Sequence, residues 1–538
     1  MLKDPARKYQ PYVAVPLPDR RWPERRIITA PIWCSVDLRD GNQALVEPMD
    51  VPRKAAMFDT LVSIGFREIE IGFPAASRAD FEFCRLLIES NRIPDEVTVQ
   101  VLVQARAHLI ERTFEALEGV PRAIVHVYNS TSTLQREVVF RTDRQGVKAI
   151  AVDGARGVQE CASRYPATDW TFQYSPESFT GTEVDYALEV CDAVTEVWQP
   201  APDRKAIINL PATVELSTPN IYADLIEWMD RRLARRSSIV LSVHPHNDRG
   251  TAVAAAELAL VAGAERVEGT LFGNGERTGN VDLVTMALNL YSQGVAPGLD
   301  FFDLPGTARA VEECNRLPIH PRHPYAGSLV FTAFSGSHQD AIRKGFAAQP
   351  LSGSWRVPYL AMDPRDIGRT YEAIVRVNSQ SGKGGVAFVL EQEYGIAMPY
   401  DLQVEFGRTI QAIADRTGVE VTPSQIWDAF QCEYLNRDHP FSRRDVGDCD
   451  DGSVQGVVEA LNRQSGQDVT IVSHEELHTG KTPNGSVIVF VVVRRSGDDA
   501  DVFGVGVNDS LELARAAAVL SAVNRSHIVE SQDTPRSA

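Results

Sequence analysis

The sequence predicts an α/β protein: a (β/α)8 barrel, then a helical accessory region, then a small α+β C-terminal domain. Short apolar runs alternate with helix-length segments through about the first 300 residues. Chemistry-bearing side chains follow the expected strands, and such barrels carry their sites at the carboxyl ends of the strands. A doubly wound open sheet is the structural rival. It usually has its glycine-rich loop after the first strand, whereas here the glycines follow the last.

The expected barrel strands are short apolar runs bounded by polar or turn residues. They cover residues 32–38, 68–73, 97–104, 123–128, 171–175, 206–210, 239–244 and 267–272. Helix-length segments between them include residues 51–64, 79–90, 107–117, 186–197, 221–233 and 250–262. This order of strand and helix is typical of a barrel.

The pattern changes after the barrel, where glycine and serine punctuate His-bearing helical pieces. A glycine-rich stretch at residues 375–385 is a loop candidate for an anion, which is weak evidence by itself. An acidic break at residues 445–452 precedes a helix at 454–462, strands at 468–474, 486–493 and 502–507, and an Ala-rich helix that ends near Val523. We therefore expect an N-terminal extension (1–30), the barrel (31–325), accessory subdomains (326–445) and a regulatory or dimerising domain (446–538).

Composition limits the function. A chain of 538 residues with 43% hydrophobic and 23% charged residues predicts two or three globular domains. The net charge of −18 argues against general nucleic-acid binding, and no apolar run reaches the roughly 18 residues of a membrane helix. The seven cysteines lack paired spacing and the first residues lack a secretory signal, so we expect a cytoplasmic protein.

His244 and His246 are the first candidates for a metal site. At the end of an extended run, residues two apart point to the same face. Each histidine could equally be a hydrogen-bonded structural residue. Asp40 and Asn280 follow other expected strands of the same barrel face, and together the four residues suit a catalytic divalent ion such as Zn, Mn, Co or Mg.

Two further charged residues have open roles. Arg39 could form a salt bridge under the barrel rim, or stabilise negative charge that develops on a metal-bound carbonyl. Glu177 could be a general base, orient a water or begin a helix.

Three motifs together resemble the 2-isopropylmalate synthase and homocitrate synthase family: residues 37–43 (DLRDGNQ), 244–250 (HPHNDRG) and 273–280 (GNGERTGN). Residues 174–180, residues 363–371 and the tail look like the longer type of 2-isopropylmalate synthase. The resemblance implies a condensation in which acetyl-CoA loses a methyl proton and attacks the ketone of 2-oxoisovalerate. Thioester hydrolysis then releases CoA.

The resemblance also implies roles for individual residues. The metal would be held by Asp40, His244 and His246 with Asn280 nearby, and Arg39 would stabilise the alkoxide. His338 and Tyr371 would act from the partner subunit of a homodimer, with Glu177 or a metal-linked water as the base. The oxoacid pocket would comprise Leu102, His126, Ser175, Asn209, Pro211 and Thr213, and the acetyl-CoA approach Gly273, Asn274, Gly275, Glu276 and Arg277.

The implied cofactor is a divalent metal (Mg, Zn or Mn), with monovalent K as an activator. Leucine would be the effector of the tail domain, where Gly504-Val505-Gly506 is a candidate part of its pocket. Other possibilities stay open: a sister synthase for another 2-oxoacid of the homocitrate or citramalate type, a lyase of the same superfamily, and a catalytically silent amino-acid sensor.

Overall fold

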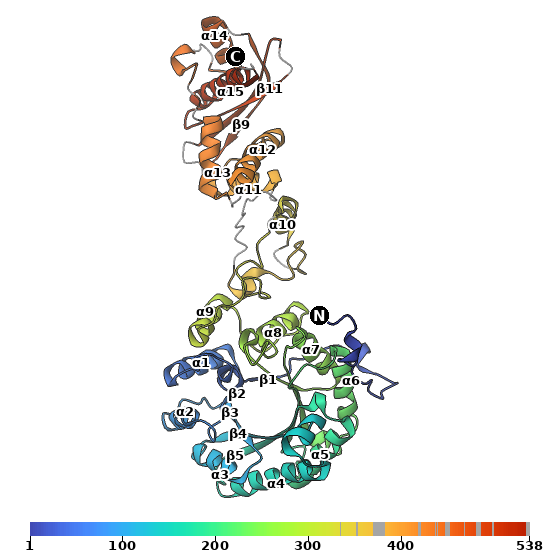
Figure 1. Ribbon diagram of the computed structural model, residues 1–538. Coiled ribbons are helices and arrows are strands. Elements are labelled where there is room, and N and C mark those ends of the chain that lie inside the picture. The colour runs from blue at the N-terminus through green and yellow to red at the C-terminus, as the bar shows by residue number, and fades with distance from the viewer. Residues whose placement is uncertain are drawn as a thin grey trace. The chain divides into compact units, whose positions relative to one another are not determined.

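The computed structural model describes residues 1–333, 335–350, 353–369, 382–417, 421–435, 437, 439–446, 452–466, 468–479, 486–497 and 500–533. The chain forms two compact units (Figure 1). Unit 1 comprises Met1–Val330 and Pro364–Arg369, and unit 2 comprises Phe331–Asp363 and Thr370–Ala538. The segment limits that we set at residues 30, 325 and 445 stay predictions.

Unit 1 is a closed barrel of eight parallel strands in sequence order, as predicted (Figure 1). β1 pairs with both β2 and β8, which closes the barrel. The strands are β1 (Ile32–Ser35), β2 (Glu68–Gly72), β3 (Thr98–Gln104), β4 (Arg122–Ser130), β5 (Asp169–Glu177), β6 (Ala206–Ala212), β7 (Ile239–Pro245) and β8 (Arg266–Gly269).

Helices surround the strands and follow local sequence signals. The first helix begins after Asp50, whose side chain accepts a hydrogen bond from the Arg53 amide, and ends at Gly65 with φ 107°. The helices of this unit are α1 (Val51–Ile64), α2 (Arg78–Glu89), α3 (Ala107–Ala116), α4 (Arg144–Ser163), α5 (Val184–Trp198), α6 (Pro219–Asp230), α7 (Ala252–Ala262), α8 (Leu283–Ser292) and α9 (Leu304–Asn315).

Two expected strands are shorter than predicted. The run 32–38 leaves the sheet at Ser35, and Asp37–Gly41 form a π-helical turn, η3. The Val36 carbonyl accepts hydrogen bonds from three amides of this turn, which makes the chain coil instead of extending. The run 267–272 ends at Gly269 and is followed by a 3-10 turn, η7 (Leu271–Gly273).

The N-terminal segment is anchored on α6 by buried carboxylates. Arg20 donates to both oxygens of Asp224 at 2.7 Å, and Glu227 accepts the amides of Arg21 and Trp22. Asp224 and Glu227 are fully buried. Two short 3-10 turns, η1 (Pro5–Arg7) and η2 (Trp22–Glu24), lie in this segment. Among the described helices, none is long and apolar enough to cross a membrane.

Unit 2 combines helices with an antiparallel three-stranded sheet of order β11-β10-β9. The predicted C-terminal α+β domain is confirmed. The glycine-rich stretch at 375–385 is a helix from Gly382 onward, and its earlier residues lie outside the described ones. The elements are α10 (Gly336–Ala348), α11 (Gly382–Tyr394), α12 (Tyr400–Thr417), α13 (Pro423–Phe430), η9 (Gln431–Leu435), η10 (Arg443–Asp445), α14 (Val454–Ser465), β9 (Val469–His478), β10 (Val487–Arg495), β11 (Asp501–Asn508) and α15 (Leu511–Asp533), while η8 (Pro364–Ile367) belongs to unit 1.

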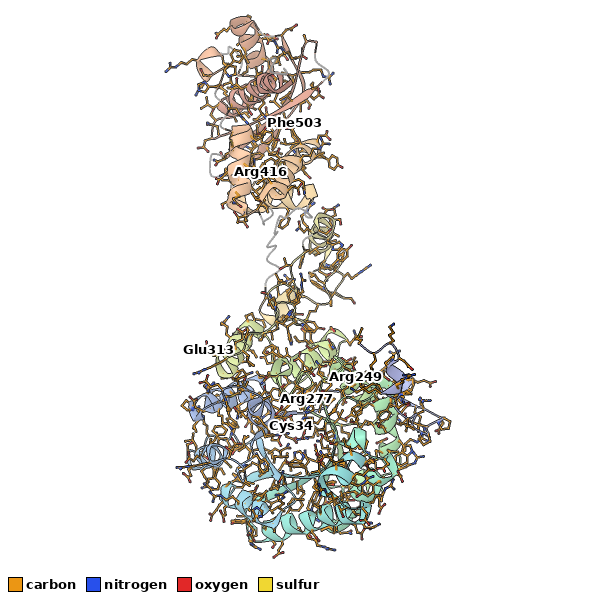
Figure 2. The ribbon with its side chains drawn as sticks, in the orientation of Figure 1. Cys34, Arg249, Arg277, Glu313, Arg416 and Phe503 are labelled. Carbon is orange, nitrogen blue, oxygen red and sulfur yellow. The ribbon has the colours of Figure 1, made fainter. Side chains whose placement is uncertain are left out.

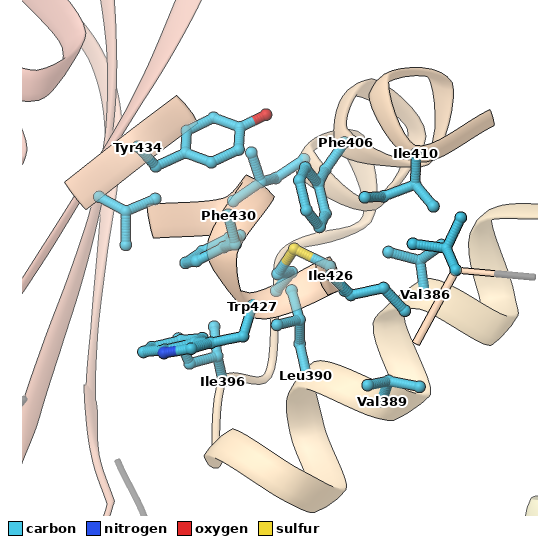
Figure 3. Packing of buried hydrophobic residues seen from close by; sticks show 14 of the residues in the cluster. Val386, Val389, Leu390, Ile396, Phe406, Ile410, Ile426, Trp427, Phe430 and Tyr434 are labelled. Carbon is cyan, nitrogen blue, oxygen red and sulfur yellow. The ribbon is translucent and has the colours of Figure 1, made fainter. Parts of the chain in front are cut away.

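Both faces of this sheet are covered, because β10 alternates its side chains between two hydrophobic clusters. Ile488 and Phe490 join the cluster of α11, α12 and α13, part of which Figure 3 shows around Phe406 and Phe430. Val489 and Val491 join the cluster with α14 and α15. Because β10 contributes to both clusters, the helical region and the tail pack on the same sheet and share one core.

Two glycines of β11 allow α15 to lie close to the sheet. A Cβ at Gly504 would collide with the Ala518 carbonyl, and one at Gly506 with the Ala514 carbonyl. The tract Gly504-Val505-Gly506 therefore lies against the backbone of α15 at its two glycines, and its part in a leucine pocket stays a prediction.

Candidate active site

Asp40, His244 and His246 meet at the carboxyl end of the barrel. Asp40 comes from the η3 turn, His244 from the end of β7, and His246 directly follows that strand. Asp40 Oδ2 lies 3.1 Å from His244 Nε2 and 3.5 Å from His246 Nε2. The ligand-type atoms of the three residues lie within 4.8 Å of one another, and all three residues are buried. The sequence motifs thus predicted a real cluster.

The donor set suits a divalent cation. Asn280 pairs with His246 through an isolated β-bridge, which sets the two residues side by side. Asn280 Oδ1 and His246 Nδ1 are buried and have no hydrogen-bond partner among the described residues. Two imidazoles, a carboxylate and an unpaired amide oxygen form the mixed nitrogen and oxygen shell of catalytic metal sites.

The two histidines differ electrostatically. Burial disfavours charge on His244, but Asp40 and Glu268 outweigh it and raise the pKa of His244 to about 9. Burial, reinforced by the neighbouring His244, lowers the pKa of His246 to about 4. Burial also opposes ionisation of Asp40, yet Arg39 and the imidazoles hold the pKa of that carboxyl well below its usual range.

Arg39 is paired and also lines the cavity beside the metal-ligand cluster. Its Nη1 lies 2.6 Å from Asp40 Oδ1, and its Nε lies 2.7 Å from Glu70 Oε2. The other oxygen of Glu70 lies 3.2 Å from His126 Nδ1. Arg39 therefore forms a salt bridge and lines the cavity at the same time, so the two roles that the sequence left open do not exclude each other. Two carboxylates hold the guanidinium in place.

A cavity of about 530 Å³ opens over this cluster. All six residues predicted for the oxoacid pocket line it: Leu102, His126, Ser175, Asn209, Pro211 and Thr213. Ser175 Oγ links the polar residues of this pocket. It lies 2.7 Å from His126 Nε2 and accepts a hydrogen bond from Asn209 Nδ2 at 2.9 Å. Residues outside our predicted set also line the cavity: Gln43, Phe73, Ala76, Gln104 and Tyr128.

Glu177 ends β5 and lines the same cavity. Burial raises the pKa of Glu177, although a hydrogen bond from the Ser178 hydroxyl at 3.2 Å opposes this shift. A carboxyl with a raised pKa beside a cavity is suited to accept or deliver a proton near neutral pH.

The loop after β8 is folded tightly against the metal-ligand cluster. Gly273 and Gly279 have φ 73° and 100°, and a Cβ at Gly279 would collide with the Gly273 carbonyl. Asn274 donates to the Gly41 carbonyl at 2.9 Å, and Gly275 packs against Asn280. Of the residues predicted for acetyl-CoA, Glu276 and Arg277 line the cavity, whereas the other three shape the loop.

Arg277 is already engaged by protein groups. Its Nε donates to Asp248 Oδ1 at 2.6 Å, and its Nη2 donates to the Thr213 carbonyl at 2.5 Å. Figure 2 labels Arg277 and Cys34 within the barrel.

The two predicted residues from the accessory region have different outcomes. His338 lies on α10 in unit 2, where its ring stacks on Tyr359 with 4.1 Å between the ring centroids. Tyr371 lies outside the described residues. Their action on a barrel site stays a prediction.

The sequence reasoning missed a buried polar layer beneath the cavity. Glu70, Gln100, Gln173, Arg266 and Glu268 are fully buried inside the barrel. Arg266 begins β8 and gave no pattern signal. The other four residues did, because each alternates with non-polar residues inside its strand. Such alternation is typical of a strand with one solvated face. In a barrel the second face points to the interior.

The comparisons with known proteins agree with this architecture. Residues 30–311 match the family described as HMGL-like. Residues 328–391 match the alpha-isopropylmalate synthase, post-catalytic domain-like family, and residues 450–527 match the LeuA allosteric (dimerisation) domain.

Full-length relatives carry one name. The 2-isopropylmalate synthase of Ralstonia nicotianae is 56% identical over 99% of this chain and 97% of its own length. Those of Parvibaculum lavamentivorans and Pseudomonas syringae pv. syringae are 55% and 53% identical, each over 98% of this chain and over 97% and 98% of their own lengths. The chain belongs to the 2-isopropylmalate synthase family.

Proposed function

We propose that this chain condenses acetyl-CoA with 2-oxoisovalerate and water to give (2S)-2-isopropylmalate and CoA, the first committed step of leucine biosynthesis. The observation that carries the proposal is the cavity in which Asp40, His244 and His246 lie beside the pocket of His126, Ser175 and Asn209. Family membership supports the same reaction.

The proposed division of labour follows from the site. Asp40, His244, His246 and Asn280 hold a divalent ion (Mg, Zn or Mn), which when bound polarises the oxoacid ketone. Arg39 lines the same cavity beside Asp40 and stabilises the alkoxide that forms on attack. Glu177 takes the methyl proton of acetyl-CoA, because it lines the cavity and burial raises its pKa, which makes it a stronger base.

Two groups complete the reaction in this proposal. Glu276 and Arg277 stand at the cavity wall where acetyl-CoA enters, and the loop of Gly273, Asn274 and Gly275 keeps them there. His338 and Tyr371 assist proton transfer or thioester hydrolysis from the partner subunit of a homodimer. K is the expected monovalent activator, and the cytoplasm the expected compartment.

The pocket favours a short monocarboxylic oxoacid over a dicarboxylate. A second carboxylate would need a free buried cation. His126 faces Glu70 at Nδ1 and Ser175 at Nε2, and Arg277 faces Asp248. A sister synthase of the homocitrate or citramalate type is the alternative to be tested.

The test mixes purified protein with acetyl-CoA, a divalent metal and a panel of 2-oxoacids, and follows free CoA with a thiol reagent. We expect much faster release with 2-oxoisovalerate than with 2-oxoglutarate or pyruvate. Preference for another acid would move the assignment to a sister synthase. No release with any acid would favour the sensor alternative.

We further propose that leucine acts on unit 2, which contains the match to the LeuA allosteric (dimerisation) domain. Adding leucine at millimolar concentration to the same assay tests this. Undiminished CoA release would remove the leucine effector and leave the synthase proposal intact.

A further inference from the structure

Glu268, on β8, is a buried carboxylate that the proposed function does not use. Its Oε2 accepts hydrogen bonds from His244 Nδ1 at 2.8 Å and from Asn209 Nδ2 at 3.3 Å. Its Oε1 accepts from three further side chains: Arg266 Nη1 at 2.7 Å, Gln173 Nε2 at 2.6 Å and Gln100 Nε2 at 3.1 Å. Each of these neighbours presents a donor to it.

The contact with His244 determines which ring nitrogen is free. A carboxylate at Nδ1 keeps the imidazole proton on that atom. When a metal displaces the second ring proton, the lone pair of Nε2 is directed at the cluster, where Nε2 lies 3.1 Å from Asp40 Oδ2. His246 lacks this support, because its Nδ1 has no partner among the described residues.

The same oxygen of Glu268 also holds part of the substrate pocket. Asn209 Nδ2 is shared between Glu268 and the Ser175 hydroxyl, which in turn contacts His126. One carboxylate oxygen thus contacts both a metal-ligand candidate and the wall of the pocket.

We infer that Glu268 is a positioning residue that orients His244 for metal binding and Asn209 toward the oxoacid. The inference rests on the proposed function, because it requires a metal at Asp40, His244 and His246. It adds to that function a residue that touches neither metal nor substrate.

Replacing Glu268 with glutamine tests whether a carboxylate is required at this position. The amide nitrogen of Gln at this position must face a donor, since both sides of Glu268 are occupied by donors. If it faces His244, the ring accepts at Nδ1 and carries its proton on Nε2, which blocks metal binding. In either orientation the buried Arg266 guanidinium loses the negative charge of its partner, and if the amide nitrogen faces Arg266 it also loses a hydrogen bond.

Glu68 offers a matched control. Its Oε2 lies 2.6 Å from Arg266 Nε, on the other edge of the same guanidinium, and it does not contact His244 in the described structure. E68Q therefore makes the same chemical change in the same ion-pair chain without touching the metal-ligand candidate.

The experiment titrates Co²⁺ into metal-free wild type, E268Q and E68Q, and records calorimetric heats and the visible absorption of bound Co²⁺. We expect the dissociation constant of E268Q to rise roughly 10- to 100-fold with an altered spectrum. E68Q should keep the wild-type affinity and spectrum even if its thermal midpoint falls. At saturating Co²⁺, E268Q should also show a raised KM for 2-oxoisovalerate.

Equal affinity and spectra in wild type and E268Q would overturn the inference, as would an equal loss in E68Q. Should E268Q not fold, E268D is titrated instead. It keeps the charge but withdraws it by one methylene, so a smaller loss is expected and equality with wild type overturns the inference. Failure of wild type to bind stoichiometric Co²⁺ would overturn the metal site itself, which separates that failure from the failure of Glu268.

Discussion

Three glutamates of the barrel interior and cavity, Glu70, Glu268 and Glu177, have different surroundings. Glu70 lies against Arg39, and Glu268 lies against Arg266, so both are held as carboxylates in ion pairs. Within the described structure, Glu177 has only the Ser178 hydroxyl as a side-chain partner. Its pKa is raised, whereas the pKa values of Glu70 and Glu268 are lowered by their neighbours despite burial. Residue chemistry alone therefore favours Glu177 for proton transfer.

Replacing His246 with alanine tests the metal-ligand cluster. The change removes one imidazole from a three-residue cluster, and we expect stoichiometric metal binding and CoA release to be lost. Metal content after dialysis and the thiol assay measure both. H108A, at an exposed position of α3, is the control and should retain both. Wild-type turnover in H246A would contradict the metal site.

Asp37 provides a pH dependence of stability. Burial raises the pKa of Asp37 to about 7, whereas in the unfolded chain the carboxyl titrates near the ordinary aspartate pKa of 3.8. Between these values the folded state keeps a proton that the unfolded state loses. The free energy of unfolding therefore falls as pH rises from 4 to 7, by at most about 1.4 kcal/mol per pH unit.

Asp37→Asn should remove this slope. An amide at this position can still accept from the Leu271 amide and donate to the Ser35 hydroxyl. Urea unfolding of wild type and variant at pH 5 and pH 7 measures the difference in stability between them. The exposed Asp153→Asn should leave the wild-type pH dependence unchanged. A wild-type slope in Asp37→Asn would contradict the raised pKa.

At the scale of elements, a buried ion pair joins the η3 turn to the start of α2. Lys54 Nζ lies 2.5 Å from Asp80 Oδ1 and 3.3 Å from the Leu38 carbonyl of η3. Asp80 Oδ2 accepts from the amide of Phe73, which lines the cavity. The pair thus holds two segments that shape the site.

Lys54→Met should destabilise the barrel by about 3–5 kcal/mol, because it leaves Asp80 without its cation. Lys148→Met, which breaks the more exposed pair with Glu189, should cost less than about 1 kcal/mol. Urea unfolding measures both. Equal losses in the free energy of unfolding would show that the buried Lys54 pair stabilises the barrel no more than the exposed Lys148 pair does.

The sequence predicts those helices and strands whose limits are set by a local sequence pattern. The α1 limits follow from the Asp50 cap and Gly65, and the strands from their apolar runs. Local patterns did not show that β1 would stop at Ser35, since the coil of η3 depends on one carbonyl, that of Val36, which accepts three amides.

Long-range placement was also beyond the sequence patterns. Pro364–Arg369 return to unit 1, where Arg369 donates to the carbonyls of Tyr325 and Gly327. The residue types of Asp40, His244 and His246 did predict that these three side chains cluster. The support of His244 by Glu268 depends on the pairing between β7 and β8, which no local signal encodes.

At the scale of the whole molecule, the proposed homodimer predicts complementation between inactive variants. R39A lacks a barrel residue and H338A lacks an accessory residue, so each alone should be inactive. If His338 acts on the partner's barrel, random mixing gives heterodimers with one intact site, and roughly a quarter of wild-type activity should return. Co-refolded mixtures assayed for CoA release measure this. No activity would return if His338 acted on the barrel of its own subunit, because both sites of the heterodimer would then lack one residue.

The ion pairs beneath the cavity have a consequence for charge balance. Metal ligation requires neutral imidazoles, so His244 gives up its extra proton when a metal binds. The connected charged groups are then two guanidinium cations and four carboxylates: Arg39 and Arg266 with Asp40, Glu68, Glu70 and Glu268. An uncompensated double negative charge inside a barrel is costly. A divalent cation at Asp40 cancels this excess, whereas a monovalent one leaves half of it. Charge balance around the ligand-competent site therefore favours a dication over a monovalent ion.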